Sequence, residues 1–204
     1  MRLLYVLIIV VLGGPATADV AQRVAAVADA SFARMPQQVT ADRIAGQCGA
    51  DETVHPTVAY CTSQNRIYVS AGSVEPPFLS YLVAHVYGHA VQVQHGVADV
   101  ALRTIRARPE DEAMLRGWVE RQVDCIAGFV LAQADLPLPD LTTYVTDDPF
   151  DRPHWGRSPL SRGPHLPIPV SDRMRWLKTG YERGLSACAV GEFDASLLLA
   201  AQRN

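Results

Sequence analysis

The segment Pro76–Gln94 limits the possible folds of this chain more than any other part of the sequence. It reads PPFLSYLVAHVYGHAVQVQ, begins with two prolines suited to the first turn of a helix, and is followed by His95-Gly96. The segment is apolar around most of a helical circumference, and a helix of this kind is usually buried in the middle of a domain. The sequence therefore predicts a central helix that carries His85 and His89.

The remaining segments predict a mainly α fold with a small β-hairpin or sheet, which is an α+β class. Apolar spacing indicates an amphipathic helix over residues 20–35, and the stretch PEDE favours the start of a second long helix. Two more helices are expected, SDRMRWLKTGYERG capped by Ser171 or Asp172, and EFDASLLLAAQ after it. The only convincing β signal lies in residues 46–69. Residues 136–170 contain eight prolines and predict an irregular surface loop.

The first residues have the pattern of a secretory signal peptide over residues 1–18. An early arginine precedes an apolar run, a Gly-Gly-Pro break and the triplet Ala-Thr-Ala, so cleavage is expected after Ala18. The apolar run is shorter than the about 20 residues that span a bilayer, and no later segment could serve as an anchor. We therefore expect an exported protein, periplasmic or secreted, with no membrane span after signal cleavage and a single domain over residues 19–204.

The charge balance argues against one class of partner. The formal net charge is -3 and the isoelectric point is near 6.0, so the chain has no basic surplus. The arginines of RTIRARPED are separated by uncharged residues and followed directly by acidic ones, so they do not form a block. Nucleic acid is therefore not an expected partner, and no feature of the sequence indicates an oligomeric state.

Four cysteines lie in the expected mature chain, at Cys48, Cys61, Cys125 and Cys188. An even number in an exported protein favours disulfides over free thiols, and the absence of a CxxC pair disfavours a zinc ribbon. Three pairings are open. We favour Cys48 with Cys61, because the segment between them carries turn signals, and therefore Cys125 with Cys188.

Two pairs of residues have the spacing of a metal site. On a helix, residues four apart share a face, so His85 and His89 can both point at one ion, as in tetrahedral zinc sites. In VERQVDC, Glu120 and Asp124 are also four apart, so one carboxylate can bind the metal while the other orients a histidine. The alternative is that both histidines are ordinary core residues, but the matching acidic pair on a following helix favours a metal site.

HVYGHAVQ followed by ERQVDCIAG resembles the neutral zinc metallopeptidases of bacteria, whose signature reads approximately HExGHHVQ and later ELQADCxAG. The resemblance includes CGADETVHPTVAYCTSQNRIYV upstream and SDRMRWLKTGYERGLSAC downstream, and so extends over most of the expected mature chain. It implies a zincin-like metallopeptidase domain that binds zinc through His85, His89 and Glu120. Asp124 would not bind the metal itself but would support one of the ligands. The resemblance also supports the cysteine pairing given above.

The resemblance does not supply the catalytic residue. In the HExxH mechanism, the glutamate after the first histidine takes a proton from the attacking water and passes it to the leaving amine. Val86 occupies that position and can do neither. A substitute base would have to come from Asp51, Glu52 or the acidic residues near Asp147.

Other histidines offer alternatives for the site. The spacing of His95 also matches the last histidine of the metzincin pattern, but Gln92 replaces the glycine at which that chain turns back, so Glu120 is the better third ligand. His154, Trp155 and His165 lie in the Pro-rich loop and could meet a ligand or the metal. Residues of this kind more often pack a loop down, and we assign that role to them and to His55.

The sequence therefore predicts a zinc-metallopeptidase-like protein that keeps a His/His/Glu zinc site, lacks the general base, and holds a peptide or protein ligand in its cleft. Two alternatives remain open. One is an active zinc hydrolase that uses another base, and the other is a structural protein without the metal.

Overall fold

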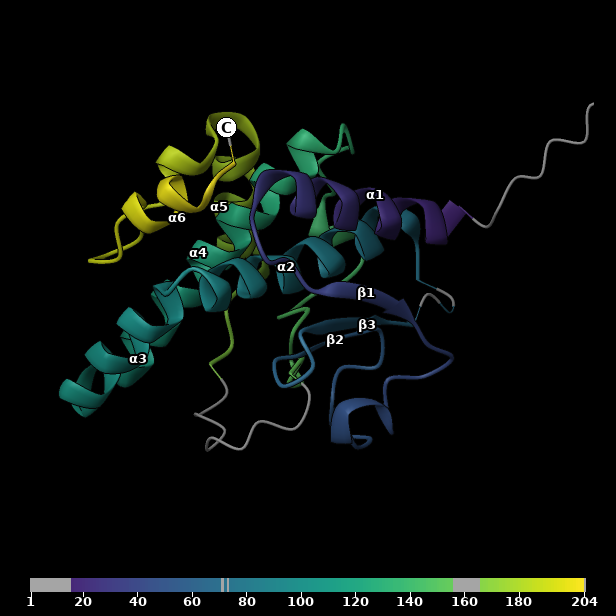
Figure 1. Ribbon diagram of the computed structural model, residues 1–204, viewed down its shortest axis with the longest axis horizontal. Helices are drawn as coiled ribbons and strands as arrows, with labels where there is room; N and C mark the ends of the chain where they lie inside the picture. Colours follow the sequence, from purple (N-terminus) through teal and green to yellow (C-terminus); the bar gives the residue numbers. More distant parts are fainter. Residues whose placement is uncertain (1–15, 71, 73, 156–165, 204) are drawn as a thin grey trace, which may run out of the picture.

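The computed structural model describes residues 16–70, 72, 74–155 and 166–203. Its helices are α1 (Ala16–Ser31), α2 (Pro76–Gln94), α3 (Val97–Ala107), α4 (Glu112–Gln133), α5 (Val170–Arg183) and α6 (Ser196–Ala201). Its strands are β1 (Gln37–Thr40), β2 (Val58–Cys61) and β3 (Arg66–Val69). The mainly helical architecture with one small sheet confirms the α+β class (Figure 1).

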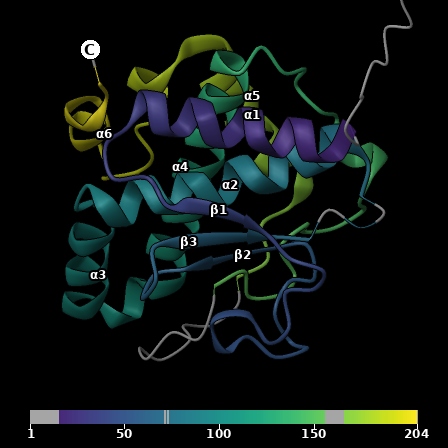
Figure 2. The ribbon, with the colours of Figure 1, turned by 45° about the vertical axis from the view of Figure 1, so that its right-hand side comes forward.

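Helix α2 is the central element, as its composition predicts. Every residue from Leu79 to Gln92 is buried. The helix lies between α1 on one side and the sheet on the other, and Figure 2 shows the same order after rotation. Helix α4 also packs along it. An apolar helix with neighbours on several sides removes nearly all of its surface from water, and this burial is the main favourable contribution to folding.

The sheet has the strand order β1-β3-β2. Strands β2 and β3 form the expected antiparallel hairpin, with Tyr60 opposite Ile67. Strand β1 pairs in parallel with β3 and was not expected, because QQVT has little β signal of its own. Since β2 is the last strand in this order, its outer side carries no further named strand within the described residues.

Glycines let the helices approach one another at their backbones. A Cβ atom on Gly88 of α2 would lie 2.9 Å from the carbonyl oxygen of Val123 on α4. A Cβ atom on Gly180 of α5 would collide with the carbonyl oxygen of Cys125, and one on Gly128 of α4 would collide with that of Leu177. Helix α4 is therefore held against both α2 and α5 at close range.

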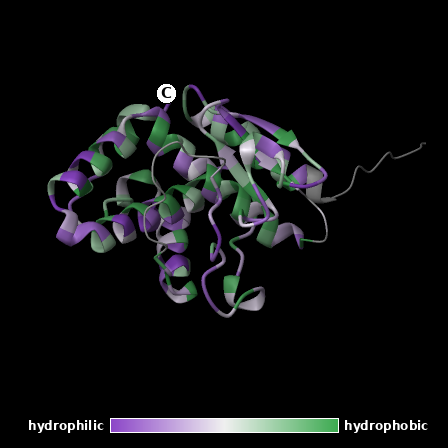
Figure 3. Cartoon of the chain, turned by 90° about the horizontal axis from the view of Figure 1, so that it is seen from below, coloured by the Kyte–Doolittle hydropathy of each residue, from purple (hydrophilic) through white to green (hydrophobic). Residues whose placement is uncertain are grey.

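Helix α3 is a further element that the sequence analysis did not include. Its buried residues Val97, Ala101 and Ile105 follow one another at intervals of one helical turn. In Figure 3, hydrophilic and hydrophobic residues are interspersed along the helices at the left of the view. The helix therefore packs by one narrow stripe and leaves its arginines on the outside.

Several expected boundaries shift. Helix α1 covers Ala16–Ser31 instead of residues 20–35, and so begins within the segment assigned to the signal peptide, whose apolar run lies outside the described residues. Helix α5 begins at Val170 after Pro169, with no side-chain cap from Ser171 or Asp172. Between α4 and α5 the described residues contain only a short 3-10 turn, Leu141–Thr143, consistent with a Pro-rich loop.

The disulfides are Cys48–Cys61 and Cys125–Cys188, the pairing favoured from the sequence. The first closes the loop before the β2–β3 hairpin, and the second ties α4 to the segment after α5. No helix among the described residues is both long and apolar enough to cross a bilayer.

We predict that Gly180→Ala destabilises the protein, because the added Cβ atom meets the backbone of α4 and forces the two helices apart. Overpacking of this kind should lower the free energy of unfolding by about 3 kcal/mol in urea denaturation. Gly117→Ala is the matched control on α4, because its Cβ atom would meet only the end of the flexible Arg121 side chain. Equal stability of the two variants would contradict the close packing of α4 and α5.

Candidate metal centre

Four side chains that can bind a metal ion converge between α2, α4 and the loop after α4. They are His85, His89, Glu120 and His154, and one donor atom from each lies within 4.8 Å of all the others. The three histidines are 0%, 2% and 6% exposed, and the Glu120 side chain is 22% exposed. The cluster is therefore almost completely shielded from water.

The helices place the first three donors. His85 and His89 share one face of α2, and their Nε2 atoms each lie 3.5 Å from a carboxylate oxygen of Glu120 on α4. The close approach of α4 at Gly88, between the two histidines, brings Glu120 within this distance. Donor atoms bound to one tetrahedral zinc ion at about 2.0–2.1 Å are separated by roughly 3.3 Å, which is close to the observed spacing.

Asp124 orients the ring of His85 by a hydrogen bond to the ring nitrogen that does not face the cluster. Its Oδ1 atom lies 2.9 Å from Nδ1 of His85 and accepts a hydrogen bond of 2.9 Å from the hydroxyl of Tyr81. Because a carboxylate only accepts hydrogen bonds, Nδ1 of His85 is the donor, and the lone pair of Nε2 is directed toward Glu120 and the cluster. The structure thus brings together His85, His89, Glu120 and Asp124.

Arg173 of α5 supplies the balancing charge, and the sequence analysis did not single it out. It is 1% exposed and donates to Oδ2 of Asp124 at 3.0 Å. It also donates to both carboxylate oxygens of Asp148, at 2.8 and 3.2 Å. A buried guanidinium between two carboxylates links α4, α5 and the loop that follows α4.

Five polar atoms of the cluster lack a hydrogen-bond partner in the described structure. They are Nε2 of His85, Nε2 of His89, Oε2 of Glu120 and both ring nitrogens of His154. A buried polar group without a partner costs about 1–3 kcal/mol, and such groups are rare in folded proteins. Their concentration at one point indicates that something else interacts with them.

The pKa values of the histidines follow from burial and from their neighbours. Burial lowers the pKa of His89 to about 3, against the opposing effect of Glu120. Burial also lowers the pKa of His154 well below its usual value. Burial also acts to lower the pKa of His85, but the interactions with Asp124 and Glu120 together outweigh this effect, so the pKa is raised. Glu120 is buried too, yet His89, His85 and Arg173 hold its pKa well below the usual range.

The other candidate histidines have different places. His95 bonds through Nε2 to the carbonyl oxygen of Ala33, at 3.0 Å, and lies outside the cluster. Nδ1 of His55 accepts hydrogen bonds from the backbone N–H groups of Thr57 and Val58. His165 lies outside the described residues.

His154 is the donor that the sequence analysis assigned to loop packing. It does pack, since its ring centroid lies 5.0 Å from that of His85 and 4.8 Å from that of His89. It also brings a fourth imidazole to the other three donors. No periodic pattern marks this residue, because its position depends on the path of an irregular loop.

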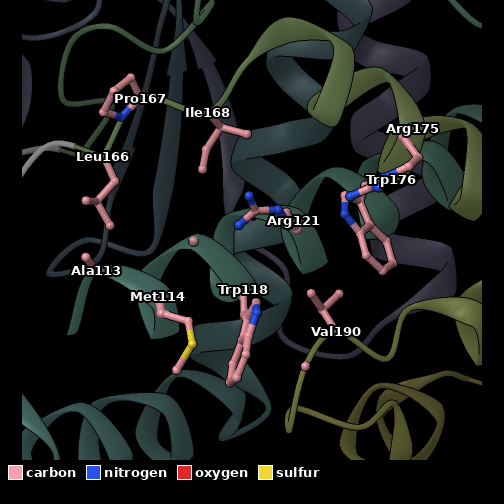
Figure 4. Close-up of a pocket in the computed structure, with 12 residues that line it drawn as sticks. Ala113, Met114, Trp118, Arg121, Leu166, Pro167, Ile168, Arg175, Trp176 and Val190 are labelled. Carbon is pink, nitrogen blue, oxygen red and sulfur yellow. The ribbon is translucent and has the colours of Figure 1, made fainter. Parts of the chain in front are cut away.

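A hollow of about 510 Å³ lies between α4, α5 and residues 166–168, and it is separate from the cluster (Figure 4). Trp118 and Trp176 line it together with Arg121 and Arg175, and both arginines pair with Asp172. The described residues that line it include none of the four metal-binding side chains.

No family model, curated protein or solved structure matches this chain. The interpretation of the cluster therefore depends on its own geometry.

We predict that Arg173→Met is strongly destabilising, because it leaves the buried carboxylates of Asp124 and Asp148 without their cation. The loss should be about 3–5 kcal/mol in urea denaturation. Arg175→Met on the same helix is the control, since that side chain is 66% exposed. It should change stability by no more than about 0.5 kcal/mol. A small effect at both positions would contradict the proposed importance of the buried network.

We also predict that the metal-free protein loses stability as the pH falls. The pKa of His55 is lowered from 6.5 to about 4 and that of His89 from 6.5 to about 3, chiefly by burial. Below pH 6.5 the unfolded chain therefore binds protons that the folded chain does not, and this difference favours unfolding. The raised pKa of His85 has the opposite effect on stability, but it is one group against the two with lowered pKa values.

Urea denaturation in the presence of a chelator should show a fall in stability between about pH 7 and about pH 5. His55→Gln should make that fall smaller, because it removes one of the groups with a lowered pKa. Stability that is constant or increases on acidification would show that these histidines are not buried in their neutral form.

Proposed function

We propose that this chain is an exported, zinc-metallopeptidase-like protein that binds one zinc ion through His85, His89 and Glu120 and does not cleave peptides. Its role is to bind or regulate a peptide or protein partner. The observation that carries the proposal is the group of five unpartnered polar atoms in the buried cluster.

A metal ion bound by His85, His89 and Glu120 would satisfy three of these atoms at once. The Nε2 atoms of His85 and His89 each lie 3.5 Å from a carboxylate oxygen of Glu120, so the three donor groups surround one small space. The lowered pKa values of His89 and Glu120 keep both groups deprotonated near neutral pH, so few protons compete with a cation there. Asp124 supports His85 in the way that carboxylates commonly support metal-binding histidines.

The donor set favours zinc among the common metals. Imidazoles with one carboxylate suit zinc and other late transition metals, whereas calcium and magnesium take oxygen donors almost exclusively. The spacing near 3.5 Å between donor atoms fits a tetrahedral ion. Zinc bound there would act as a Lewis acid and as a link between α2 and α4.

Val86 supports the absence of peptidase activity. It follows His85 on α2 and is completely buried in the main core, where its aliphatic side chain can neither accept nor donate a proton. General acid–base assistance contributes about 10²–10⁴-fold to catalytic rates. Among the described residues, Asp51, Glu52 and Asp147 are not part of the four-donor cluster, and the neighbouring Asp148 is paired with Arg173.

The proposed location follows from the sequence and the disulfides together. The first residues resemble a signal peptide, and both Cys48–Cys61 and Cys125–Cys188 are oxidised. Disulfides persist in oxidising compartments such as the periplasm and the extracellular space. Likewise, the segments HVYGHAVQ and ERQVDCIAG support kinship with zincin-like metallopeptidases, because they supply the residues of the cluster on α2 and α4.

We predict that the purified mature protein contains one zinc ion per chain by mass spectrometry and does not cleave an unfolded protein substrate. The double variant His85→Ala, His89→Ala should contain no zinc, because two donors are lost. His95→Ala is the matched control, since His95 lies at the end of the same helix and outside the cluster. Circular dichroism should verify that each variant is folded.

Absence of zinc from the wild-type protein, even after zinc is supplied, would refute the metal site. Zinc that remains in the double variant would assign it to other residues. Cleavage of the unfolded substrate by the wild-type protein, but not by the double variant, would refute the claim that the protein lacks peptidase activity.

A further inference from the structure

The segment Pro149–Trp155 lies directly over the metal-binding side chains. The ring of Phe150 stacks on His85, with centroids 3.8 Å apart and planes 23° apart. The ring of Trp155 lies 4.5 Å from that of His89. His154 stands between them, with its ring within about 5 Å of both helix histidines. The segment therefore separates the cluster from solvent.

The backbone of this segment pairs with the outer side of β2. The N–H of Tyr60 in β2 donates to the carbonyl oxygen of His154 at 2.9 Å, and Trp155 forms a parallel bridge with Tyr60. Just before β2, the N–H of His55 donates to the carbonyl oxygen of Pro153 at 2.8 Å. Extended peptides commonly bind to exposed edge strands through the same backbone groups. Here a part of the chain itself occupies that edge.

The segment is anchored at its start. Asp148 accepts hydrogen bonds from the backbone N–H groups of Phe150 and Ile168, each at 2.9 Å, while both of its oxygens also contact Arg173. Arg173 in turn pairs with Asp124, which orients His85. A single buried network thus positions both the segment and the first histidine.

His154 is the part of the segment that meets the cluster. Its side chain is buried, and neither ring nitrogen has a hydrogen-bond partner in the described structure. A buried imidazole that only packed would normally bond to a backbone group, as His55 does with Thr57 and Val58. Catalytic zinc sites have three protein donors and one open position, whereas structural sites have four protein donors.

We propose that Pro149–Trp155 is an internal occupant of the metal cleft, in which His154 is the fourth zinc ligand and the backbone covers the edge of β2. The proposal rests on the zinc site proposed above. The consequence is a closed, four-coordinate ion that outside ligands cannot reach while the segment is in place.

Cobalt(II) in place of zinc tests this proposal by visible absorption, with acetohydroxamic acid as the outside ligand. The wild-type cobalt protein should have the intense spectrum of a four-coordinate ion and should not respond to acetohydroxamic acid. In His154→Ala the spectrum should change with saturable binding of that probe, because one position is opened. Imidazole added to His154→Ala should restore the wild-type spectrum.

His154→Phe keeps a ring over the cluster but removes the metal bond, so it separates ligation from packing. Its affinity for cobalt should fall at least about tenfold. A loss of this size is already typical when a residue that only hydrogen-bonds to a metal ligand is replaced. His55→Gln is the matched control, because His55 is a buried histidine beside Phe150 and outside the cluster. It should retain both the wild-type spectrum and the insensitivity to acetohydroxamic acid.

The possible failures can be distinguished. If no variant and no wild-type protein binds cobalt or zinc, the proposed metal site itself is wrong. If the wild-type protein binds cobalt and its spectrum responds to acetohydroxamic acid, or if His154→Phe retains full affinity, the site exists but the segment does not close it.

Discussion

The buried carboxylate of Asp124 is the interaction on which the rest of the site depends. It joins Tyr81 and His85 of α2 to Arg173 of α5, and Arg173 extends the network to Asp148 in the following loop. A charge without exposure to water must be paired in the folded state. The helices can therefore meet only in the arrangement that satisfies Asp124, and that arrangement also directs the free nitrogen of His85 toward Glu120.

In the proposed function, metal binding and catalysis depend on different residues. Three of the four donors of the cluster come from two helices that lie close together at Gly88. Val86 is buried in the core and has no group that can transfer a proton, while His154 brings a further imidazole to the other three donors. If the proposed zinc site and its closure by His154 hold, these two features, one in a helix and one in a loop, would both oppose hydrolysis.

The parts of the structure that depend on local spacing could be predicted from the sequence. The apolar run of α2, the four-residue intervals on α2 and α4, and the β2–β3 hairpin all follow from short-range patterns. Strand β1 could not be predicted, because QQVT becomes a strand only through its pairing with β3. Helix α3 does have a readable stripe at Val97, Ala101 and Ile105, which the sequence analysis did not use.

For the site, the four residues at four-residue intervals on α2 and α4 were predictable, and the others were not. His154 and Asp148 reach the cluster and its network through a Pro-rich loop, whose path no periodicity describes. Arg173 lies on a helix, but its role depends on the close contact between α4 and α5 at Gly180. Such long-range partners follow from tertiary packing, and one sequence carries no direct signal for them.

The position of the cluster determines how an ion could enter or leave. Its donors come from α2, from α4 and from the loop that contains His154, and buried contacts connect all three. Exchange of a bound ion would therefore require these elements to separate, which would be a local unfolding event. An ion taken up while the chain folds would be exchanged very slowly afterwards. The metal found in the protein would then reflect the ions present where it folded, and not those around it later.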